Sequence, residues 1–201
     1  GLPKTDRSPL FAAHFRSDRE RVAAMLAPDR MTMVQCAPAV RTSIAEEYGL
    51  APGTLTPGQL AAALRRLGFA RVYDTVFAAD VTIMEESAEL LQRLQSGTHL
   101  PMFTSCCPAW VNFFEHHFPD MLDIPSTARS PQQMFGAIAK NYLAPKLGID
   151  RRNFIVVSVM PCVAKKSEAA RPEFGKDGDP DVNISITTRE LAHMIRFANM
   201  N

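Results

Sequence analysis

The stretch Phe154–Met160 (FIVVSVM) decides the fold class of this chain, because it has the pattern of a fully buried β-strand. A continuous apolar run rich in Val and Ile is typical of a parallel strand that is covered on both faces. Pro161 and Cys162 follow directly and end the strand. A thiol therefore lies at the carboxyl end of a buried strand, where open α/β sheets gather their binding sites.

Further strands are predicted on both sides of this one. They are expected at Met31–Cys36, Phe69–Thr75, Leu100–Phe103 and Ile184–Ile186. Helical segments alternate with them, and several begin at a Ser or Thr N-cap, as at Ser17, Thr56, Ser130 and Thr187. This alternation predicts an α/β fold with a mainly parallel sheet flanked by helices.

Two other segments carry local expectations. The helix predicted from Phe77 to Leu94 has an apolar side, which consists of Ile83, Met84, Leu90, Leu91 and Leu94. Residues 171–183 are polar and contain Pro and Gly, so they are predicted to form a surface loop.

Composition excludes several classes of function. The chain has 201 residues, 46% of them hydrophobic and 21% charged, with a net charge of +1. This balance gives no electrostatic reason to expect a nucleic-acid or membrane-surface partner. The first seven residues contain no apolar signal-peptide core, and no apolar run reaches the roughly 18–20 residues of a membrane span. We therefore expect a soluble protein without membrane insertion.

The chain has four cysteines, too few for a disulfide scaffold of this length. Cys36 lies inside a predicted strand, and packing is its favoured role. Cys106 and Cys107 are adjacent after Thr104-Ser105, and Cys162 follows Met160-Pro161. Their spacing does not match the C-x2-C pattern of structural zinc sites, but four thiolates could ligate one iron–sulfur cluster if they converged.

The segments TSCCPAW (104–110) and MPCVAKKSE (160–168) resemble the first two signature motifs of the H-cluster domain of [FeFe]-hydrogenases. VQCAPAVR (34–41), ADVTIMEESAEL (79–90) and STARSPQQMFGA (126–137) are similar to other segments of that family. The resemblance implies an iron hydrogenase that catalyses 2H⁺ + 2e⁻ ⇌ H₂. Its cofactor would be an H-cluster: a [4Fe–4S] cluster and a diiron subsite with CO and CN ligands and a dithiolate bridge.

The resemblance also implies a role for individual residues. Cys107 and Cys162 would be metal ligands, Cys106 would exchange protons with the diiron subsite, and Lys165 would contact a cyanide ligand. The cofactor pocket would be lined by Ala37, Pro38, Pro131, Gln132 and Met160.

The implied proton route runs from Cys106 through Glu86, Ser126 and Glu89, with Arg93 at its surface end and Glu168 near it. Glu86 and Glu89 are spaced i,i+3, so one helix face presents both carboxylates. Without the resemblance, a solvated acidic face would be the favoured interpretation of these glutamates. The resemblance favours the proton route.

The family's third motif, a C-x3-C pair in a Gly-rich segment, is absent from this sequence. Cys107 and Cys162 supply only two of the four ligands that a [4Fe–4S] cluster needs. We therefore expect residues 1–201 to be the N-terminal portion of a split or truncated catalytic domain, completed by another segment or chain. Two alternatives are a non-catalytic H₂-sensing module and an iron–sulfur scaffold or assembly protein.

No ferredoxin-like run of cysteines is present. Electrons would therefore come from a ferredoxin or another iron–sulfur electron-transfer subunit. Reduced thiols favour the cytoplasm as the location.

Overall fold

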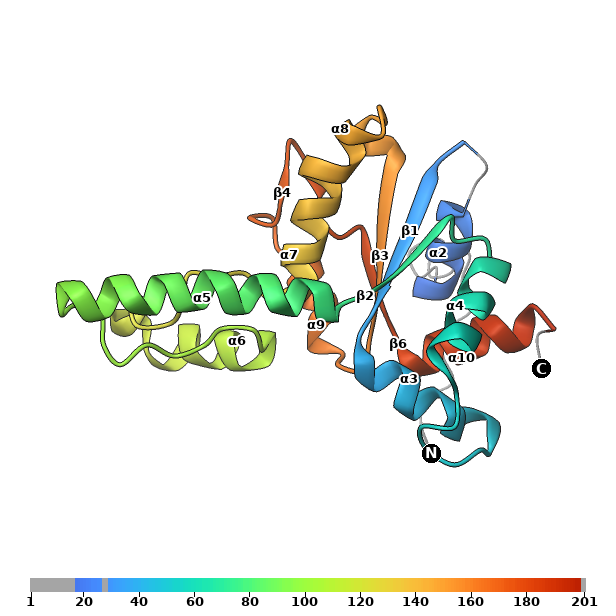
Figure 1. Cartoon of the computed structure of the whole chain (residues 1–201), viewed down its shortest axis with the longest axis horizontal. Coiled ribbons are helices and arrows are strands. Elements are labelled where there is room, and N and C mark those ends of the chain that lie inside the picture. The colour runs from blue at the N-terminus through green and yellow to red at the C-terminus, as the bar shows by residue number, and fades with distance from the viewer. Residues whose placement is uncertain (1–16, 27–28, 200–201) are drawn as a thin grey trace, which may run out of the picture.

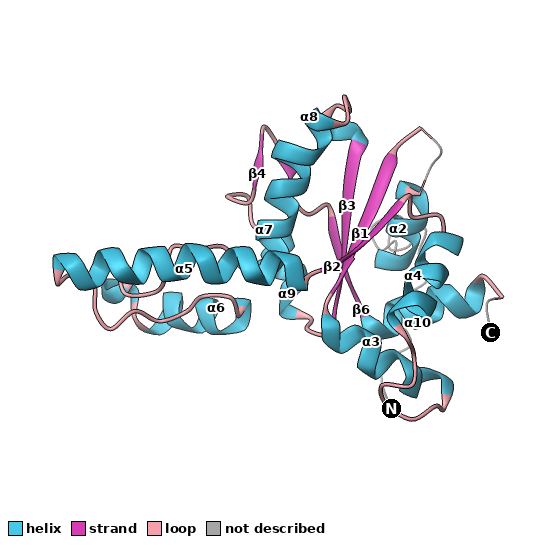
Figure 2. Ribbon diagram, viewed as in Figure 1, coloured by secondary structure: helices cyan, strands magenta, loops and turns pink. Residues whose placement is uncertain are grey.

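A four-stranded parallel sheet forms the centre of the computed structural model, which describes residues 17–26 and 29–199 (Figures 1 and 2). The order of its strands is β2–β1–β3–β6. Their bounds are Met31–Cys36 for β1, Arg71–Asp74 for β2, Phe154–Met160 for β3 and Ile184–Thr187 for β6. These bounds confirm the predicted α/β class and the buried central strand. The first seven residues, where no signal peptide was expected, lie outside the described part of the chain.

Helices cover both faces of the sheet (Figure 2). One face packs against α2 (Asp18–Met25), α3 (Pro38–Ile44), α4 (Pro57–Arg66) and α10 (Thr188–Phe197). The other face packs against α7 (Pro131–Ile138), its π-helical continuation η3 (Ala139–Leu143) and α8 (Ala144–Lys146). Because strand side chains alternate, Val157 of β3 enters the first core and Val156 enters the second.

The predicted helix starts are confirmed where capping chemistry fixes them. Ser17, Thr56 and Thr187 each accept a hydrogen bond from a backbone N–H three residues later. The residue at that position returns a side-chain bond to the cap, so each start is a complete capping box. Short 3₁₀ turns complete the connections at Ala45–Tyr48 (η1), Pro119–Met121 (η2) and Arg151–Asn153 (η4).

An arm formed by residues 76–130 projects from one side of the sheet (Figure 1). It contains the long helix α5 (Val76–Ser96), α6 (Pro108–His117) and η2. The strand predicted at Leu100–Phe103 is wrong: Phe103 forms only an isolated parallel bridge with Pro125. Pro101 has no N–H to donate to a strand ladder, and the central sheet does not extend into the arm. The first cysteine motif therefore does not follow a strand of the sheet.

The expected surface loop at 171–183 has more structure than its composition suggests. It contains a short hairpin of β4 (Gly175–Lys176) and β5 (Asp179–Pro180), followed by buried Asp181. Asp181 pairs with Arg129 and Arg151, and Asp179 pairs with Lys140, whose side chain is fully buried. Burial is possible here because each carboxylate meets a cation.

The apolar side of α5 does not face the protein. Ile83, Met84, Leu91 and Leu94 are all more than half exposed, while Arg93 of the same helix is buried. Among the described residues, none of the helices, α5 included, combines the length and the apolar character that a membrane span requires.

Candidate active site

The second cysteine motif connects β3 to α9 (Ala164–Ala169). Met160 is the last residue of the strand and is buried, whereas the Cys162 thiol is exposed in the turn that follows. The backbone N–H of Lys165 donates to the Cys162 carbonyl, which closes this turn. The strand therefore fixes where the loop begins, and α9 fixes where Lys165 lies.

The first cysteine motif lies in the arm, immediately before α6. Cys107 is the N-cap residue of α6, and Pro108 occupies its first turn. The hydroxyl of Ser105 donates to the carbonyls of Ser126 and Ala128, at 2.9 and 3.1 Å, and so ties the motif to the segment that precedes α7. The thiols of Cys106 and Cys107 are both exposed.

Lys165 joins the two motifs. Its Nζ donates to the Cys106 carbonyl at 2.8 Å, so a side chain from the second motif holds the backbone of the first. The same Nζ lies 3.0 Å from the carboxylate of buried Glu168. The next residue, Lys166, points elsewhere and pairs with Asp18 and Glu190.

Gln132 organises the polar interior beneath Lys165. Its side-chain amide donates to the Lys165 carbonyl at 3.0 Å and to Glu168 at 2.9 Å. Its Oε1 accepts a 2.8 Å hydrogen bond from Ser158, in the middle of β3. Gln35 donates to the backbone carbonyl of Gln132. Gln132 thus directs its side chain into the protein rather than toward the exposed thiols.

Ser158 and Gln35 were missed by sequence reasoning. The sequence does contain a signal for them: each is a polar residue inside an apolar strand, and a buried polar side chain normally has a hydrogen-bond partner. Both are fully buried, on neighbouring strands β3 and β1.

The predicted proton-route residues are only partly brought together. The Ser126 hydroxyl donates to Glu89 Oε2 at 2.7 Å, and the Thr127 N–H and Arg93 also donate to this carboxylate. Burial raises the pKa of Glu89, but these hydrogen bonds and the Arg93 charge outweigh it, so the net shift is downward. Glu89 is therefore held as a carboxylate.

Arg93 does not lie at the surface end of a route. It is 7% exposed, and its guanidinium donates to the carbonyls of His99, Ile124 and Pro125 as well as to Glu89. A guanidinium supplies five N–H donors, which lets one side chain clamp α5 to the loop that carries Ser126.

Glu86 is close to this group in sequence but differs from it in bonding. Its Oε1 is buried and has no hydrogen-bond partner among the described residues. A buried carboxylate oxygen without a partner is costly, so a bound water or a group outside this structure must satisfy it. Glu168, expected near the route, instead pairs with Lys165, although it lines a cavity of about 240 Å³ together with Ser126.

Three of the four remaining residues predicted to line the pocket lie at the carboxyl edge of the sheet. Register pairs Cys36 with Val159, so Ala37-Pro38 and Met160-Pro161 follow adjacent parallel strands. Pro131 begins α7 behind the Ser130 N-cap. The carboxyl edge of the sheet therefore carries Ala37, Pro38 and Met160 side by side, and their role in lining one pocket stays a prediction.

Cys36 behaves as a packing residue. It is buried in the core, and burial, with a smaller contribution from Asp74, raises the pKa of its thiol to about 12. A thiol with this pKa is not a ready metal ligand.

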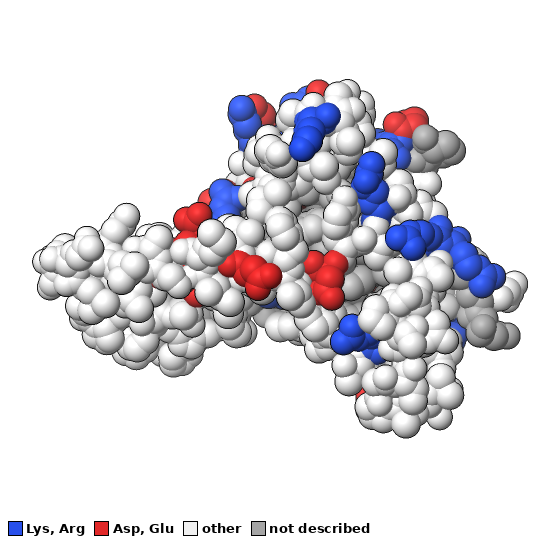
Figure 3. All heavy atoms as spheres, viewed as in Figure 1, with Lys and Arg blue, Asp and Glu red and all other residues white. Residues whose placement is uncertain are grey.

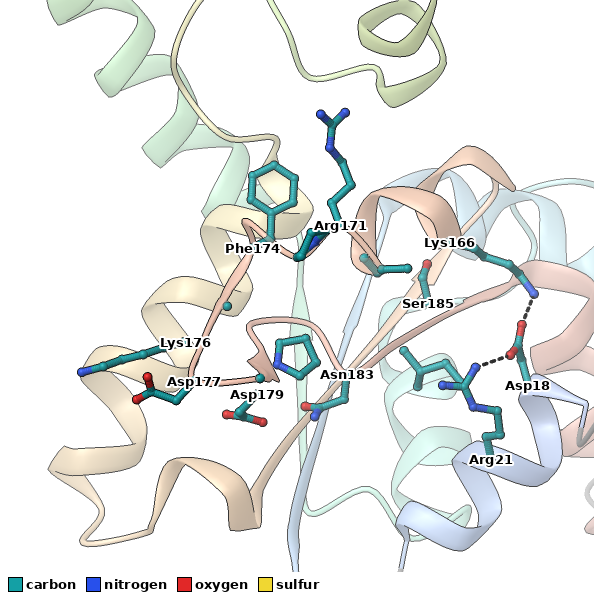
Figure 4. A pocket seen from close by; sticks show the side chains of 17 residues that line it. Asp18, Arg21, Lys166, Arg171, Phe174, Lys176, Asp177, Asp179, Asn183 and Ser185 are labelled. Atoms are coloured by element: carbon teal, nitrogen blue, oxygen red, sulfur yellow. Dashed lines mark hydrogen bonds and ion pairs between the residues drawn. The ribbon is translucent and has the colours of Figure 1, made fainter. Parts of the chain in front are cut away.

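A cavity of about 530 Å³ lies away from the cysteine loops, between α2, α9 and the β4–β5 hairpin (Figure 4). Its walls include Lys166, Asp18 and Arg21, which form a chain of ion pairs in Figure 4. None of the predicted site residues lines it.

The cysteines of this chain fit an iron–sulfur cofactor only in part. Cys107 and Cys162 are exposed thiols at the ends of ordered loops that Lys165 links. Within residues 17–26 and 29–199, however, no three His, Cys, Asp or Glu side chains gather closely enough to hold a metal ion. The two thiols predicted as ligands, Cys107 and Cys162, are half the number that a [4Fe–4S] cluster takes.

Solved structures identify the class of protein. The chain superimposes on a variant of apo [FeFe]-hydrogenase HydA1 from Chlamydomonas reinhardtii with a TM-score of 0.87 and 47% sequence identity. The match covers 92% of this chain and 48% of that chain. The fold is therefore that of [FeFe]-hydrogenase catalytic chains.

Sequence comparison gives the family. Residues 30–201 match the family described as "Iron only hydrogenase large subunit, C-terminal domain", and the chain belongs to it. It is 60% identical over 188 residues to the NADP-reducing hydrogenase subunit HndD of Solidesulfovibrio fructosivorans, covering 90% of this chain and 32% of that subunit. A more distant relative is the cytosolic Fe-S cluster assembly factor narfl of Danio rerio, 34% identical over 173 residues, covering 83% of this chain and 42% of that protein. The chain thus spans about a third to a half of the length of these relatives.

Proposed function

We propose that this chain is one portion of the catalytic domain of an [FeFe]-hydrogenase and takes part in 2H⁺ + 2e⁻ ⇌ H₂. The observation that carries the proposal is the Lys165–Cys106 contact, because it brings together two cysteine motifs that lie far apart in the sequence. The hydrogenase subunit HndD, at 60% identity, and the hydrogenase HydA1, at 47%, support the same activity.

In this proposal Cys107 and Cys162 are ligands of a [4Fe–4S] cluster, and a further segment or chain supplies the C-x3-C ligands. The cofactor is an H-cluster, which supplies the electrons and the site of H–H bond formation when bound. Lys165 is the cation for its anionic cyanide ligands, since an ammonium is a strong donor to such groups. Ala37, Pro38, Pro131 and Met160 line the pocket. Gln132 acts indirectly, by holding Lys165 and Glu168.

Protons move between the Cys106 thiol and solvent through Glu86, Ser126 and Glu89. The 2.7 Å hydrogen bond from Ser126 to Glu89 supports the outer half of this route. Glu86 Oε1 supports the inner half of the route. It is buried and accepts no hydrogen bond from the described residues, so it is available to a proton donor. Such a relay is useful because proton reduction needs titratable groups close to the reacting atoms.

The test is a chimera in which this chain replaces the matched 188 residues of HndD. Iron content, infrared bands of CO and CN ligands, and H₂ turnover are measured after maturation. Cys106→Ala should abolish turnover with the infrared bands retained. Cys107→Ala should remove the iron, whereas Cys36→Ala, at a packing position, should leave iron content unchanged. Turnover within a few-fold of the parent in Cys106→Ala would contradict the proton route.

An assembly or scaffold function is the second candidate, and the 34% identical relative named as an assembly factor favours it. An H₂-sensing module is a third. A scaffold would bind iron without CO and CN bands, and a sensor would show the bands without turnover. The chimera therefore separates all three functions.

The electron partner in this proposal is a ferredoxin or another iron–sulfur electron-transfer subunit. We propose the cytoplasm as the location, because ligand thiols must stay reduced until the cluster is inserted.

A further inference from the structure

Residues 126–130 join three parts of the proposed site, and we call them the junction segment. The Ser126 hydroxyl donates to Glu89, and the Ala128 N–H donates to the same hydroxyl at 3.1 Å. The Ala128 carbonyl accepts a hydrogen bond from Ser105 of the first cysteine motif. The last residue of the segment caps α7. The position of this segment therefore decides the geometry of the outer proton route.

The junction segment lies where the arm joins the sheet, because α7 begins directly after it. On the face shown in Figure 3, the far end of the arm carries no charged side chain among the residues described, whereas charged groups are spread over the rest. On this face, charge is available to hold the arm at its base and not at its tip.

Arg129 ties the junction segment to the β4–β5 hairpin. Its Nη1 donates to Asp181 Oδ2 at 2.6 Å, and its guanidinium lies 5.4 Å from the centre of the Phe174 ring. Asp181 follows β5 and Phe174 precedes β4, so both contacts are made at the ends of the hairpin. The Asp181 side chain is only 3% exposed, so salt and water screen this pair less than a surface ion pair.

Asp181 is a fixed anchor for this contact. Its backbone N–H donates to the Phe174 carbonyl, and its second carboxylate oxygen accepts a 2.6 Å hydrogen bond from Arg151. α7 also packs directly on it, since a Cβ on Gly136 would lie 2.7 Å from the Asp181 carbonyl oxygen. The carboxylate therefore has little freedom to move, and it defines where the Arg129 guanidinium lies.

We propose that Asp181 is a positioning residue for the proton route. Acting through Arg129, it holds the junction segment where the Ser126 hydroxyl reaches Glu89. This inference rests on the proposed function. Asp181 exchanges no proton with the route, because Arg129 lies between them and a guanidinium stays protonated in proteins. The outer route is thus held from two directions, with Arg93 fixing the carboxylate and Asp181 fixing the hydroxyl.

Asp179, two residues earlier, supplies a matched control. It pairs with Lys140 and Arg151, so it belongs to the same group of buried ions as Asp181. Among the described residues, its carboxylate makes no ion pair with Arg129. Replacing either aspartate removes one carboxylate partner of Arg151, but only Asp181→Asn releases Arg129.

The first test is amide hydrogen exchange of this chain, measured residue by residue by NMR. The Thr127 and Ala128 amides report on the junction segment, because they donate to Glu89 and to Ser126 Oγ, and the amides of β3 report on global unfolding. We expect Asp181→Asn to accelerate exchange at Thr127 and Ala128 by about tenfold beyond any change in β3, the effect of losing one charge-assisted hydrogen bond. Asp179→Asn should change both sets of amides alike. Equal acceleration of both sets in Asp181→Asn would overturn the proposal.

Arg129 provides a second variant that keeps the anchor intact. Its side chain is 36% exposed, and its loss leaves Asp181 paired with Arg151. Arg129→Met should accelerate exchange at Thr127 and Ala128 as Asp181→Asn does, and the double variant should show no further acceleration. Additive effects of the two substitutions would mean that Asp181 does not act through Arg129, and would overturn the proposal.

The second test is H₂ turnover by the HndD chimera. Asp181→Asn should lower turnover by about tenfold or more, with the iron content and the CO and CN bands retained, because the proton relay is misaligned. The solvent deuterium isotope effect should rise as proton transfer becomes rate-limiting. Asp179→Asn should keep the isotope effect of the parent. An unchanged isotope effect in Asp181→Asn would count against the positioning role.

The exchange measurement does not depend on hydrogenase activity, so the two proposals fail separately. A parent chimera without turnover would contradict the proposed function alone. An active parent chimera, combined with exchange at Thr127 and Ala128 that Asp181→Asn leaves unchanged, would overturn the positioning role alone.

Discussion

The hydroxyl of Ser126 donates a 2.7 Å hydrogen bond to the carboxylate of Glu89. This bond joins the loop after η2 to α5, and Arg93 reinforces it from the same helix. It therefore holds the arm together as well as forming part of the proposed proton route.

The pH dependence of stability should reveal this carboxylate. The pKa of Glu89 is lowered below its ordinary value of 4.5, so its contribution is complete above that value and is lost as the pH falls through the folded pKa. Glu89→Gln should cost about 2 kcal/mol of unfolding free energy at neutral pH. Urea denaturation in steps down to about pH 3 should show the difference from the parent shrinking. A difference that stays constant with pH, or an equal effect from the exposed control Glu85→Gln, would count against this assignment.

The four cysteines should differ in how fast they react with a thiol reagent, with three reacting rapidly and one slowly. Cys106, Cys107 and Cys162 are exposed, whereas Cys36 is buried with its pKa raised to about 12. Because the thiolate is the nucleophile, a disulfide reagent at pH 8 should label three thiols rapidly and the fourth only after unfolding. Absorbance of the released thiolate measures the two phases. Cys36→Ala should remove the slow phase alone; a single phase of four would show that the core around Cys36 is open.

Removing the Glu168 side chain should loosen both cysteine motifs. Its carboxylate accepts from Lys165 and Gln132 while nearly fully buried, so Glu168→Ala removes one acceptor from each of these two donors. We expect a loss of about 1–3 kcal/mol in unfolding free energy. Hydrogen exchange of the backbone at residues 104–108 should also accelerate, because Lys165 would no longer be fixed against the Cys106 carbonyl. If Glu168→Ala lowered stability by this amount but left hydrogen exchange at residues 104–108 unchanged, Glu168 would not be supporting the first cysteine motif.

Two glycines should respond to alanine in opposite directions. A Cβ on Gly136 would lie 2.7 Å from the Asp181 carbonyl oxygen and from a Val182 methyl, so Gly136→Ala should cost about 1–3 kcal/mol. The nearest atom to a Cβ on Gly58 is Thr56 Oγ1 at 4.0 Å, and Gly58→Ala in α4 should gain up to about 1 kcal/mol. Thermal unfolding of the two variants checks both signs. Stabilisation by Gly136→Ala would mean that α7 can move away from the segment at Asp181.

The elements that the sequence predicts best are those with local causes. The buried strands β1 and β3 follow from apolar runs, and α2, α4 and α10 follow from capping boxes that lie within four residues. The expected strand at Leu100–Phe103 failed because a short apolar run does not reveal whether a sheet is within reach. Pro101 was the local sign against it, because a proline has no N–H to donate to a strand ladder.

The site was predictable where a motif carries it and not where distant partners decide it. The position of Cys162 just after β3 agrees with expectation, whereas Cys106 and Cys107 do not follow a strand of the sheet. The resemblance placed Arg93 at the surface end of the proton route, but Arg93 is buried, and its burial depends on three carbonyls that follow it in the arm. The β4–β5 hairpin likewise depends on Lys140, which helical periodicity gives no reason to bury. Long-range pairing of charges is the information that a linear pattern lacks.

The hydrogen bonds around Gln132 set a constraint on anyone who redesigns this protein. Both hydrogens of its side-chain amide and its oxygen are engaged. Among the residues that the structure describes, the Ser158 hydroxyl bonds to Gln132, and the Gln35 amide bonds to Gln132 and Thr75. A computational search for a tighter core would replace these polar residues one at a time with leucine or valine. Each single replacement strands a neighbour's donor or acceptor, so these positions can be optimised only as one unit.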